Sequence, residues 1–275
     1  MTSKTDNFQT QPWPVVRNAV LTTLSLHRPH TVYGFIEVDV TRAITLINQY
    51  RRELRVAVTL HAFVAYCLTQ AAQKYPVMHT FRHGKSLIRF DDIDLATAID
   101  RRMPDGHRMA VGYTFRAAQA KSLATINWEL RAATNADLSQ DPLVKLRRRF
   151  ARLPWFVRSW FAWRMKRNPH LLKRINGTIG LTNLQSPGTP GTFWGLPTNV
   201  FTCTMAIGGI AERDGRKMLC LSAGVDHAIT DGLTLSRFTA AFAALLQSAA
   251  GLDEAFVTET RALLVAERGA PETAP

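Results

Sequence analysis

The order of strand-like and helix-like segments constrains the fold of this chain more than any other feature of its sequence. Residues 32–40 alternate apolar and polar side chains and are rich in β-branched residues, which predicts a strand. Two helical patterns follow directly, and later strand-like segments come singly or as a hairpin rather than each before a helix. Because strict β-α-β alternation is missing, the sequence predicts a layered α/β protein with a largely mixed β-sheet.

Local signals set the expected limits of the elements. Thr41 is the expected N-cap of a helix over residues 42–54, and Thr59 opens a strongly apolar helix over residues 60–74 that Pro76 ends. Further strands are expected at residues 87–90 and 93–99, joined by an acidic turn, and at 109–115 and 178–182, with a hairpin from 200–210 and 217–223. Further helices are expected at residues 15–26, 122–133 and 234–248, and a loop at 185–195.

Length and composition place the chain among ordinary globular proteins. Its 275 residues suffice for one large domain or two small ones, and 46% of them are hydrophobic. Its three cysteines lie in apolar runs without metal-ligand spacing, which indicates buried thiols in a reducing compartment and a cytoplasmic location. Residues 1–11 are polar, lack a signal-peptide core and are expected to be disordered. No glycine-rich phosphate-binding motif is present, so nucleotide binding of that kind is unsupported.

The positive charge of the chain is concentrated in one segment. The formal net charge is +13, and residues 145–174 hold 11 Lys or Arg and no Asp or Glu, which leaves 13 − 11 = +2 for all other residues. The high isoelectric point is therefore a property of this segment and not of the fold.

A histidine at the end of a predicted strand is the strongest candidate for chemistry. His227 comes shortly after the apolar run at residues 218–221, four residues before Asp231 and five before Gly232. Histidine is the side chain best suited to take a proton near neutral pH, and a strand end places it at a rim that a substrate can reach. The pattern alone is only moderately specific, and a packed or solvated histidine is the alternative.

Other titratable residues lack such a context. Three aspartates lie close together but alternate with apolar residues, which fits a turn and a strand edge better than a metal site. They are Asp91, Asp92 and Asp94. The remaining histidines occur without a motif and are expected in ordinary surface or core positions. They are His27, His30, His61, His79, His83, His107 and His170.

Four stretches of the chain occur in an order that carries a family resemblance. They are residues 36–41, residues 59–76 with 91–98, residues 177–191 (GTIGLTNLQSPGTPG) and residues 226–232 (DHAITDG), of which the last two are specific. Together they resemble the catalytic domain of the dihydrolipoamide acyltransferase (E2) subunit of 2-oxoacid dehydrogenase complexes, over about residues 12–250. This family belongs to the chloramphenicol-acetyltransferase-like superfamily, so the resemblance implies a two-layer α/β sandwich with a mixed β-sheet. The aspartate before the histidine favours the E2 branch over the chloramphenicol branch.

The resemblance implies acyl transfer from a CoA thioester, with His227 as the general base. Thr182 stands where the family has a serine whose hydroxyl stabilises the oxyanion, and Gln185 replaces the glycine that follows this motif in the family. Threonine keeps the hydroxyl and adds a methyl group. Two alternatives remain open: His227 is a relic of a lost activity, or Thr182 and Asn183 form an ordinary turn.

The residues after the histidine have supporting roles in the resemblance. Asp231 holds the loop through an arginine and does not touch substrate, and Arg17 is the candidate arginine. Gly232 is expected to permit a tight backbone where the next helix begins.

The resemblance also implies an assembly. Single-copy members of the superfamily place the active site between the subunits of a trimer, so a homotrimer is expected. The chain carries no lipoyl domain, hence no covalently bound lipoate, and no subunit-binding domain, which predicts a stand-alone acyltransferase. Residues 251–275 form a C-terminal extension that is polar at its tip, which favours an isolated trimer over a larger core. No metal is implied.

The basic segment at residues 145–174 has no counterpart in ordinary E2 domains. Pro154 and Pro169 bracket a predicted helix in which Phe156, Trp160 and Trp163 share one face. One interpretation is a helix lying on an anionic membrane, and a second is a docking patch for an acidic partner such as an acyl carrier protein or the phosphates of CoA. The third is a helix that packs its aromatic residues on its own subunit. No nucleic-acid fold signature accompanies the segment, so nucleic acid is not expected.

Specific residues of that helix are the candidates for a membrane or partner patch. They are Arg158, Trp160, Trp163, Arg164, Lys166 and Arg167. A second functional hypothesis follows from them: a catalytically silent trimeric scaffold that uses this patch to bind membranes or an acidic partner.

Overall fold

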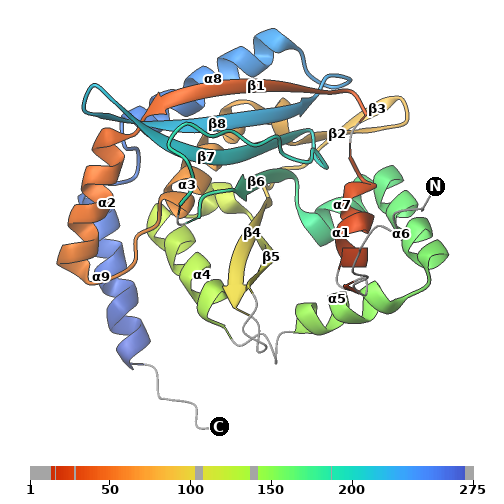
Figure 1. Ribbon diagram of the computed structural model, residues 1–275, viewed down its shortest axis with the longest axis horizontal. Coiled ribbons are helices and arrows are strands. Elements are labelled where there is room, and N and C mark those ends of the chain that lie inside the picture. Colours follow the sequence, from red (N-terminus) through yellow and green to blue (C-terminus); the bar gives the residue numbers. More distant parts are fainter. Residues whose placement is uncertain are drawn as a thin grey trace, which may run out of the picture.

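The computed structural model describes residues 14–15, 17–27, 29–102, 108–136, 142–186 and 188–269. Within these residues, six strands form one mixed sheet in the order β1-β8-β7-β6-β4-β5 (Figure 1). The strands are β1 (Thr31–Asp39), β4 (Leu95–Arg102), β5 (Arg108–Phe115), β6 (Ile179–Asn183), β7 (Cys203–Arg213) and β8 (Arg216–Asp226). The pairs β4–β6 and β6–β7 are parallel, and the other pairs are antiparallel. The predicted α/β class with a mixed sheet is confirmed, while residues 1–11 lie outside the described part of the chain.

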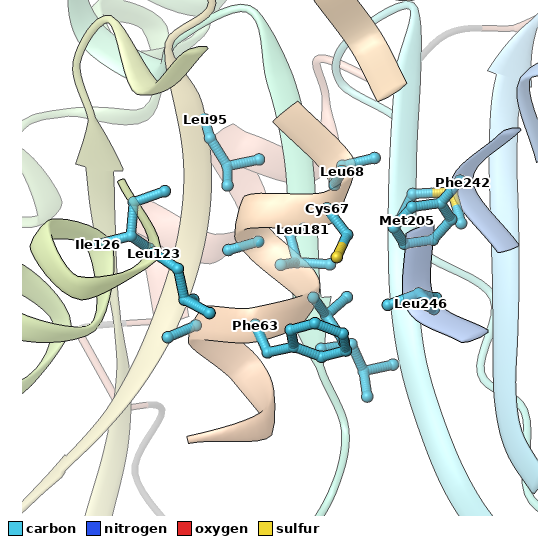
Figure 2. Packing of buried hydrophobic residues seen from close by; sticks show 14 of the residues in the cluster. Phe63, Cys67, Leu68, Leu95, Leu123, Ile126, Leu181, Met205, Phe242 and Leu246 are labelled. Atoms are coloured by element: carbon cyan, nitrogen blue, oxygen red, sulfur yellow. The ribbon is translucent and has the colours of Figure 1, made fainter. Parts of the chain in front are cut away.

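The helix α3 (Leu60–Lys74) forms the centre of the hydrophobic core. Figure 2 shows Phe63, Cys67 and Leu68 of α3 between two other helices, with Leu181 and Met205 of the sheet close by. The flanking helices are α4 (Leu123–Asn135) and α8 (Gly232–Gln247). Each fully buried large side chain in this cluster contributes about 1.5–3 kcal/mol. This packing holds α8 against the sheet, and it thereby fixes the position of the first residues of that helix.

Two further helices pack against the same core. They are α2 (Thr41–Leu54) and α9 (Glu254–Gly269). Phe256 of α9 is buried, and its ring lies 5.6 Å from that of Tyr50 in α2. Residues 251–275 were expected only as a C-terminal extension, so α9 was not predicted, whereas α2 was.

The expected helix caps are partly right. Thr59 caps α3, because its hydroxyl accepts a hydrogen bond from the Ala62 amide at 3.1 Å. The expectation for Thr41 is wrong: it is the first residue of α2, and its hydroxyl donates to Asp39 Oδ1 at 2.6 Å. The same hydroxyl accepts a hydrogen bond from the Lys217 amide at 2.8 Å, so it joins α2 to β8 and does not cap the helix backbone.

The strand expected at residues 87–90 belongs to a small two-stranded sheet. The strand β3 (Ser86–Arg89) pairs with β2 (Thr80–His83), which was not predicted, rather than with the following strand. The turn between them uses Gly84 at φ 61°, a conformation that favours glycine. The acidic residues after β3 make no hairpin turn. Asp94 is buried instead, where it accepts hydrogen bonds from Arg116 and from the Ala117 amide, both at 2.9 Å.

The basic segment folds as three helices that pack with the N-terminal helix. They are α5 (Pro142–Arg152), α6 (Trp155–Arg167) and α7 (Pro169–Asn176), joined by α1 (Arg17–Leu24). Figure 1 shows this group on the side of the molecule opposite α2 and α9. A separate small cluster attaches it to the sheet domain, consisting of Leu26, Phe81, Ala162, Met165, Leu172, Val200 and Phe201. Among the described residues, no helix has the length and apolar character needed to cross a membrane.

Candidate active site

The turn between β8 and α8 presents His227 to solvent. Asp226, the last residue of β8, is buried, and its Oδ1 accepts a hydrogen bond from the Ala228 amide at 3.0 Å. The His227 amide donates to the carbonyl of His30 at 2.8 Å, which ties the turn to the residue before β1. With its backbone held from both sides, His227 has an exposed side chain at the end of the sheet.

Asp231 acts on the backbone of α8. It is the N-cap of that helix, and its Oδ1 accepts from the Thr234 amide at 2.7 Å. This backbone hydrogen bond is the main reason why the pKa of Asp231 is lowered. Arg17, the candidate partner, lies exposed at the start of α1, and within the described part of one chain it makes no ion pair with Asp231.

The expected role of Gly232 is wrong for a single chain. Its φ is not positive, and a Cβ built on it would meet no atom within 4 Å. The backbone at this position is therefore ordinary, so glycine is not needed for a tight bend. Its missing side chain instead leaves open space at the start of α8.

Two hollows follow β1 from His30 to Ile36. The first, of about 510 Å³, is wide open and is lined by His30, Thr31, Val32, His227 and Ala228. The second, of about 230 Å³, lies between β1 and α8. Its lining is mainly apolar and consists of Gly34, Phe35, Ile36, Ala223, Gly232, Leu235, Ser236 and Thr239. The imidazole of His227 thus borders an open surface beside an apolar pocket.

His30 is a site residue that the sequence analysis missed. It reaches His227 because β1 pairs with β8, with Thr31 opposite Asp226. No local motif surrounds His30, and only this long-range pairing brings the two histidines to one pocket.

The end of β6 holds the second candidate element. Asn183 Oδ1 accepts from the Gln185 amide at 3.0 Å, so the alternative of an ordinary Asx turn is confirmed for Asn183. Thr182 is half-buried, and its hydroxyl has no hydrogen-bond partner among the described residues. The hydroxyl therefore remains available to a ligand.

His227 and Thr182 lie far apart within one chain. Thr182 is level with Ala206, which is level with Ser222 of β8, five residues before His227. Two strand spacings of about 4.8 Å and five residues of about 3.3 Å place their Cα atoms roughly 19 Å apart. One copy of the chain therefore does not bring the two side chains together.

Other reactive groups are inert or engaged elsewhere. Burial raises the pKa of the Cys67 and Cys203 thiols, so both are protonated near neutral pH. Burial lowers the pKa of His61 to about 4, and its Nε2 lies 2.7 Å from Thr97 Oγ1. In the described ranges, no group of three or more His, Cys, Asp or Glu is arranged to hold a metal ion.

Comparison with solved structures shows which proteins share this fold. A probable dihydrolipoamide acetyltransferase from Listeria monocytogenes 4b F2365 has 20% identity and a TM-score of 0.63, covering 88% of this chain and 95% of that one. The cubic core of a pyruvate dehydrogenase multienzyme complex has 18% identity and a TM-score of 0.65, with 91% and 96% covered. The Azotobacter vinelandii dihydrolipoamide acetyltransferase (E2p) has 18% identity, a TM-score of 0.63 and the same coverage.

Sequence comparison agrees with the fold. No curated protein matches the chain significantly. Residues 5–140 match the family model of the 2-oxoacid dehydrogenases acyltransferase (catalytic domain). By this match over residues 5–140, just under half of the chain, and by a fold shared along most of its length, the chain resembles the 2-oxoacid dehydrogenases acyltransferase catalytic domains.

Proposed function

We propose that the protein is a CoA-dependent acyltransferase that moves an acyl group between a CoA thioester and a thiol, hydroxyl or amine acceptor. The observation that carries this proposal is the exposed imidazole of His227 at an open pocket, at a strand end of an acyltransferase fold. A thiol or hydroxyl is a weak nucleophile until a neighbouring base removes its proton. His227 is the histidine of the family-like motif, and its surroundings leave the ring accessible.

The reaction follows from this placement. His227 takes the proton of the acceptor while the acceptor's sulfur, oxygen or nitrogen attacks the thioester carbonyl. The tetrahedral intermediate then expels the CoA thiolate, which receives the proton from the imidazolium. The bond between acyl carbon and CoA sulfur breaks, the bond to the acceptor forms, and no oxidant or metal takes part.

The negative charge on the intermediate requires a donor. Thr182 is our candidate, because its hydroxyl is without a partner among the described residues. Removing one oxyanion donor typically costs about 10²–10³ in rate. Since the Cα atoms of Thr182 and His227 lie roughly 19 Å apart within one chain, the threonine must come from a second copy, and a closed homotrimer would provide it.

A structural neighbour has been studied at similar residue types. In the Azotobacter vinelandii enzyme, a serine, a histidine and an asparagine four residues after that histidine have been examined for their role in catalysis. We take Thr182, His227 and Asp231 as the corresponding positions here, since Asp231 likewise comes four residues after the histidine. In our proposal, Asp231 positions the loop by capping α8 and does not touch the substrate.

Replacing His227 tests the proposal. His227→Asn should lower turnover by about 10²–10⁴ without changing the oligomeric state, because it removes the base and leaves the backbone hydrogen bonds of the turn. The assay is thiol release from acetyl-CoA and longer acyl-CoAs with thiol, alcohol and amine acceptors. His83→Asn, an exposed histidine on β2 away from both pockets, is the matched control. Equal activity of His227→Asn and the wild type would remove His227 from the mechanism.

A further inference from the structure

The outer face of α6 is an exposed aromatic surface. The exposed fractions on this face are 59% for Phe156, 60% for Trp160 and 49% for Trp163, and Trp155, at the start of the helix and off this face, is 72% exposed. The interpretation in which these rings pack on their own subunit is therefore wrong within a single chain. Such a group of large apolar side chains on one helix is uncommon on a protein that meets only water.

The opposite face of the same helix is fixed in the protein. Ala162 and Met165 are both buried and belong to the small cluster that joins this group of helices to the sheet domain. At about 100° per residue, they lie roughly opposite to Phe156, Trp160 and Trp163 on the helix. The aromatic face is therefore held outward by packing, and it does not depend on a flexible loop.

Basic side chains border the aromatic face on both sides. The same periodicity of about 100° per residue places Arg164 on one flank and Lys166 on the other, and both are exposed. Arg167 lies in line with the rings, with its guanidinium carbon 4.3 Å from the centre of the Trp163 ring. No acidic residue occurs anywhere in residues 145–174 to neutralise these charges.

The neighbouring helices also carry exposed apolar residues. α1 and α5 pack against each other, and α1 packs against α6. Their exposed large apolar side chains are Val20, Leu21, Leu24 and Leu146, and Leu153 lies exposed between α5 and α6.

We propose that the α6 face binds the surface of an anionic lipid bilayer. Tryptophan rings settle at the level of the lipid headgroups, and each Lys or Arg near an anionic surface adds further attraction. An acidic protein surface would neutralise the Lys and Arg side chains but would leave the aromatic rings of α6 largely exposed to water. A second copy of α6 would bring two positive faces together, which repel each other. Rings and cations together therefore fit the lipid surface best.

Vesicle flotation of the full-length protein tests the two components separately. The vesicles contain phosphatidylcholine alone or phosphatidylcholine with phosphatidylglycerol. The wild type should float only with the anionic vesicles. The triple variant Arg164→Gln/Lys166→Gln/Arg167→Gln should bind roughly 100-fold more weakly, at about fivefold per charge. Trp160→Ser/Trp163→Ser should lose roughly tenfold per ring.

Matched controls come from exposed residues on other helices and strands. Arg42→Gln/Arg52→Gln/Arg261→Gln removes the same charge from α2 and α9, and Leu87→Ser/Val265→Ser removes exposed apolar side chains. Both controls should bind anionic vesicles like the wild type. Brominated lipid tails should quench the tryptophan fluorescence of the wild type and quench that of the Trp160/Trp163 variant less.

Several outcomes would overturn the proposal. Equal vesicle binding by the Trp160/Trp163 variant and the wild type would mean that the protein binds through nonspecific attraction of its positive charges and that the rings take no part. A loss of binding in the Arg42/Arg52/Arg261 control as large as in the α6 charge variant would point to net charge alone. A smaller oligomer for the Trp160/Trp163 variant, measured without lipid, would make the face an interface between copies. None of these measurements depends on acyltransferase activity, so this proposal can fail while the proposed function holds, and the reverse.

Discussion

Two inactive variants of this protein should restore each other's activity when they assemble together. Thr182→Ala removes the proposed oxyanion donor and His227→Ala removes the proposed base. Strand spacings of about 4.8 Å and a rise of about 3.3 Å per residue separate the two positions by roughly 19 Å within one chain. Each active site would therefore take its histidine from one copy and its hydroxyl from a neighbour.

The arrangement sets the size of the recovery. A mixed cyclic trimer contains two subunits of one variant and one of the other. It has three interfaces, and at one of them an intact His227 from a Thr182→Ala subunit meets an intact Thr182 from a His227→Ala subunit. Mixed trimers should therefore recover about one-third of the wild-type turnover, and an unselected equal mixture about one-quarter.

The assay requires trimers of known composition. The two variants are co-expressed with different affinity tags, and mixed trimers are isolated by two successive purifications. Thiol release from acyl-CoA is then compared with that of each variant alone. If the mixed trimers prove no more active than their parents, the inference of a site divided between copies is wrong. A site within one chain would give that result.

Two further predictions concern stability. The folded protein holds His61 at a pKa of about 4 against 6.5 for the free side chain, so the folded state binds fewer protons between these values. The free energy of unfolding should therefore have its full value above pH 6.5 and fall by up to about 3 kcal/mol as the pH drops towards 4, measured by urea unfolding. In His61→Gln, this part of the pH dependence should be absent. Gly208→Ala should cost roughly 1–3 kcal/mol because a Cβ would collide with the Phe193 carbonyl oxygen, whereas Gly232→Ala should leave the melting temperature unchanged or slightly higher. A flat pH profile, or equal melting temperatures for the two alanine variants, would contradict these assignments.

The parts of the fold that were predicted correctly carry their signals locally. The helix α3 begins at a capping threonine, Thr59, and ends just before Pro76. The hairpin of β7 and β8 turns at Asp214 and Gly215, both with positive φ, which is the conformation that an Asp-Gly pair favours. Such signals depend on a few neighbouring residues and need no knowledge of the tertiary structure.

The missed elements owe their structure to distant partners. The four-residue strand β2 (Thr80–His83) is too short to show an alternating pattern, and its pairing with β3 defines it. The helix α9 is stabilised by contacts of Phe256 with α2, which sequence periodicity cannot display.

The candidate site divides in the same way. His227 and Asp231 belong to one local motif, and in the structure Asp231 caps the helix that follows the histidine, a role that was not predicted. His30 joins them only through the pairing of β1 with β8. The distance between Thr182 and His227 likewise depends on the order of strands across the sheet, which no local pattern contains.

The two proposals become physically coupled if the chain closes into a trimer. A threefold axis would present three copies of the α6 face at the same inclination to that axis. If the faces point along the axis, all three would meet one lipid surface at once, and the second and third contacts would form at a high effective concentration. A weak interaction at each α6 would then hold the whole assembly on the bilayer. Variants that break the trimer should accordingly lose vesicle binding as well as turnover, although they leave every residue of α6 unchanged.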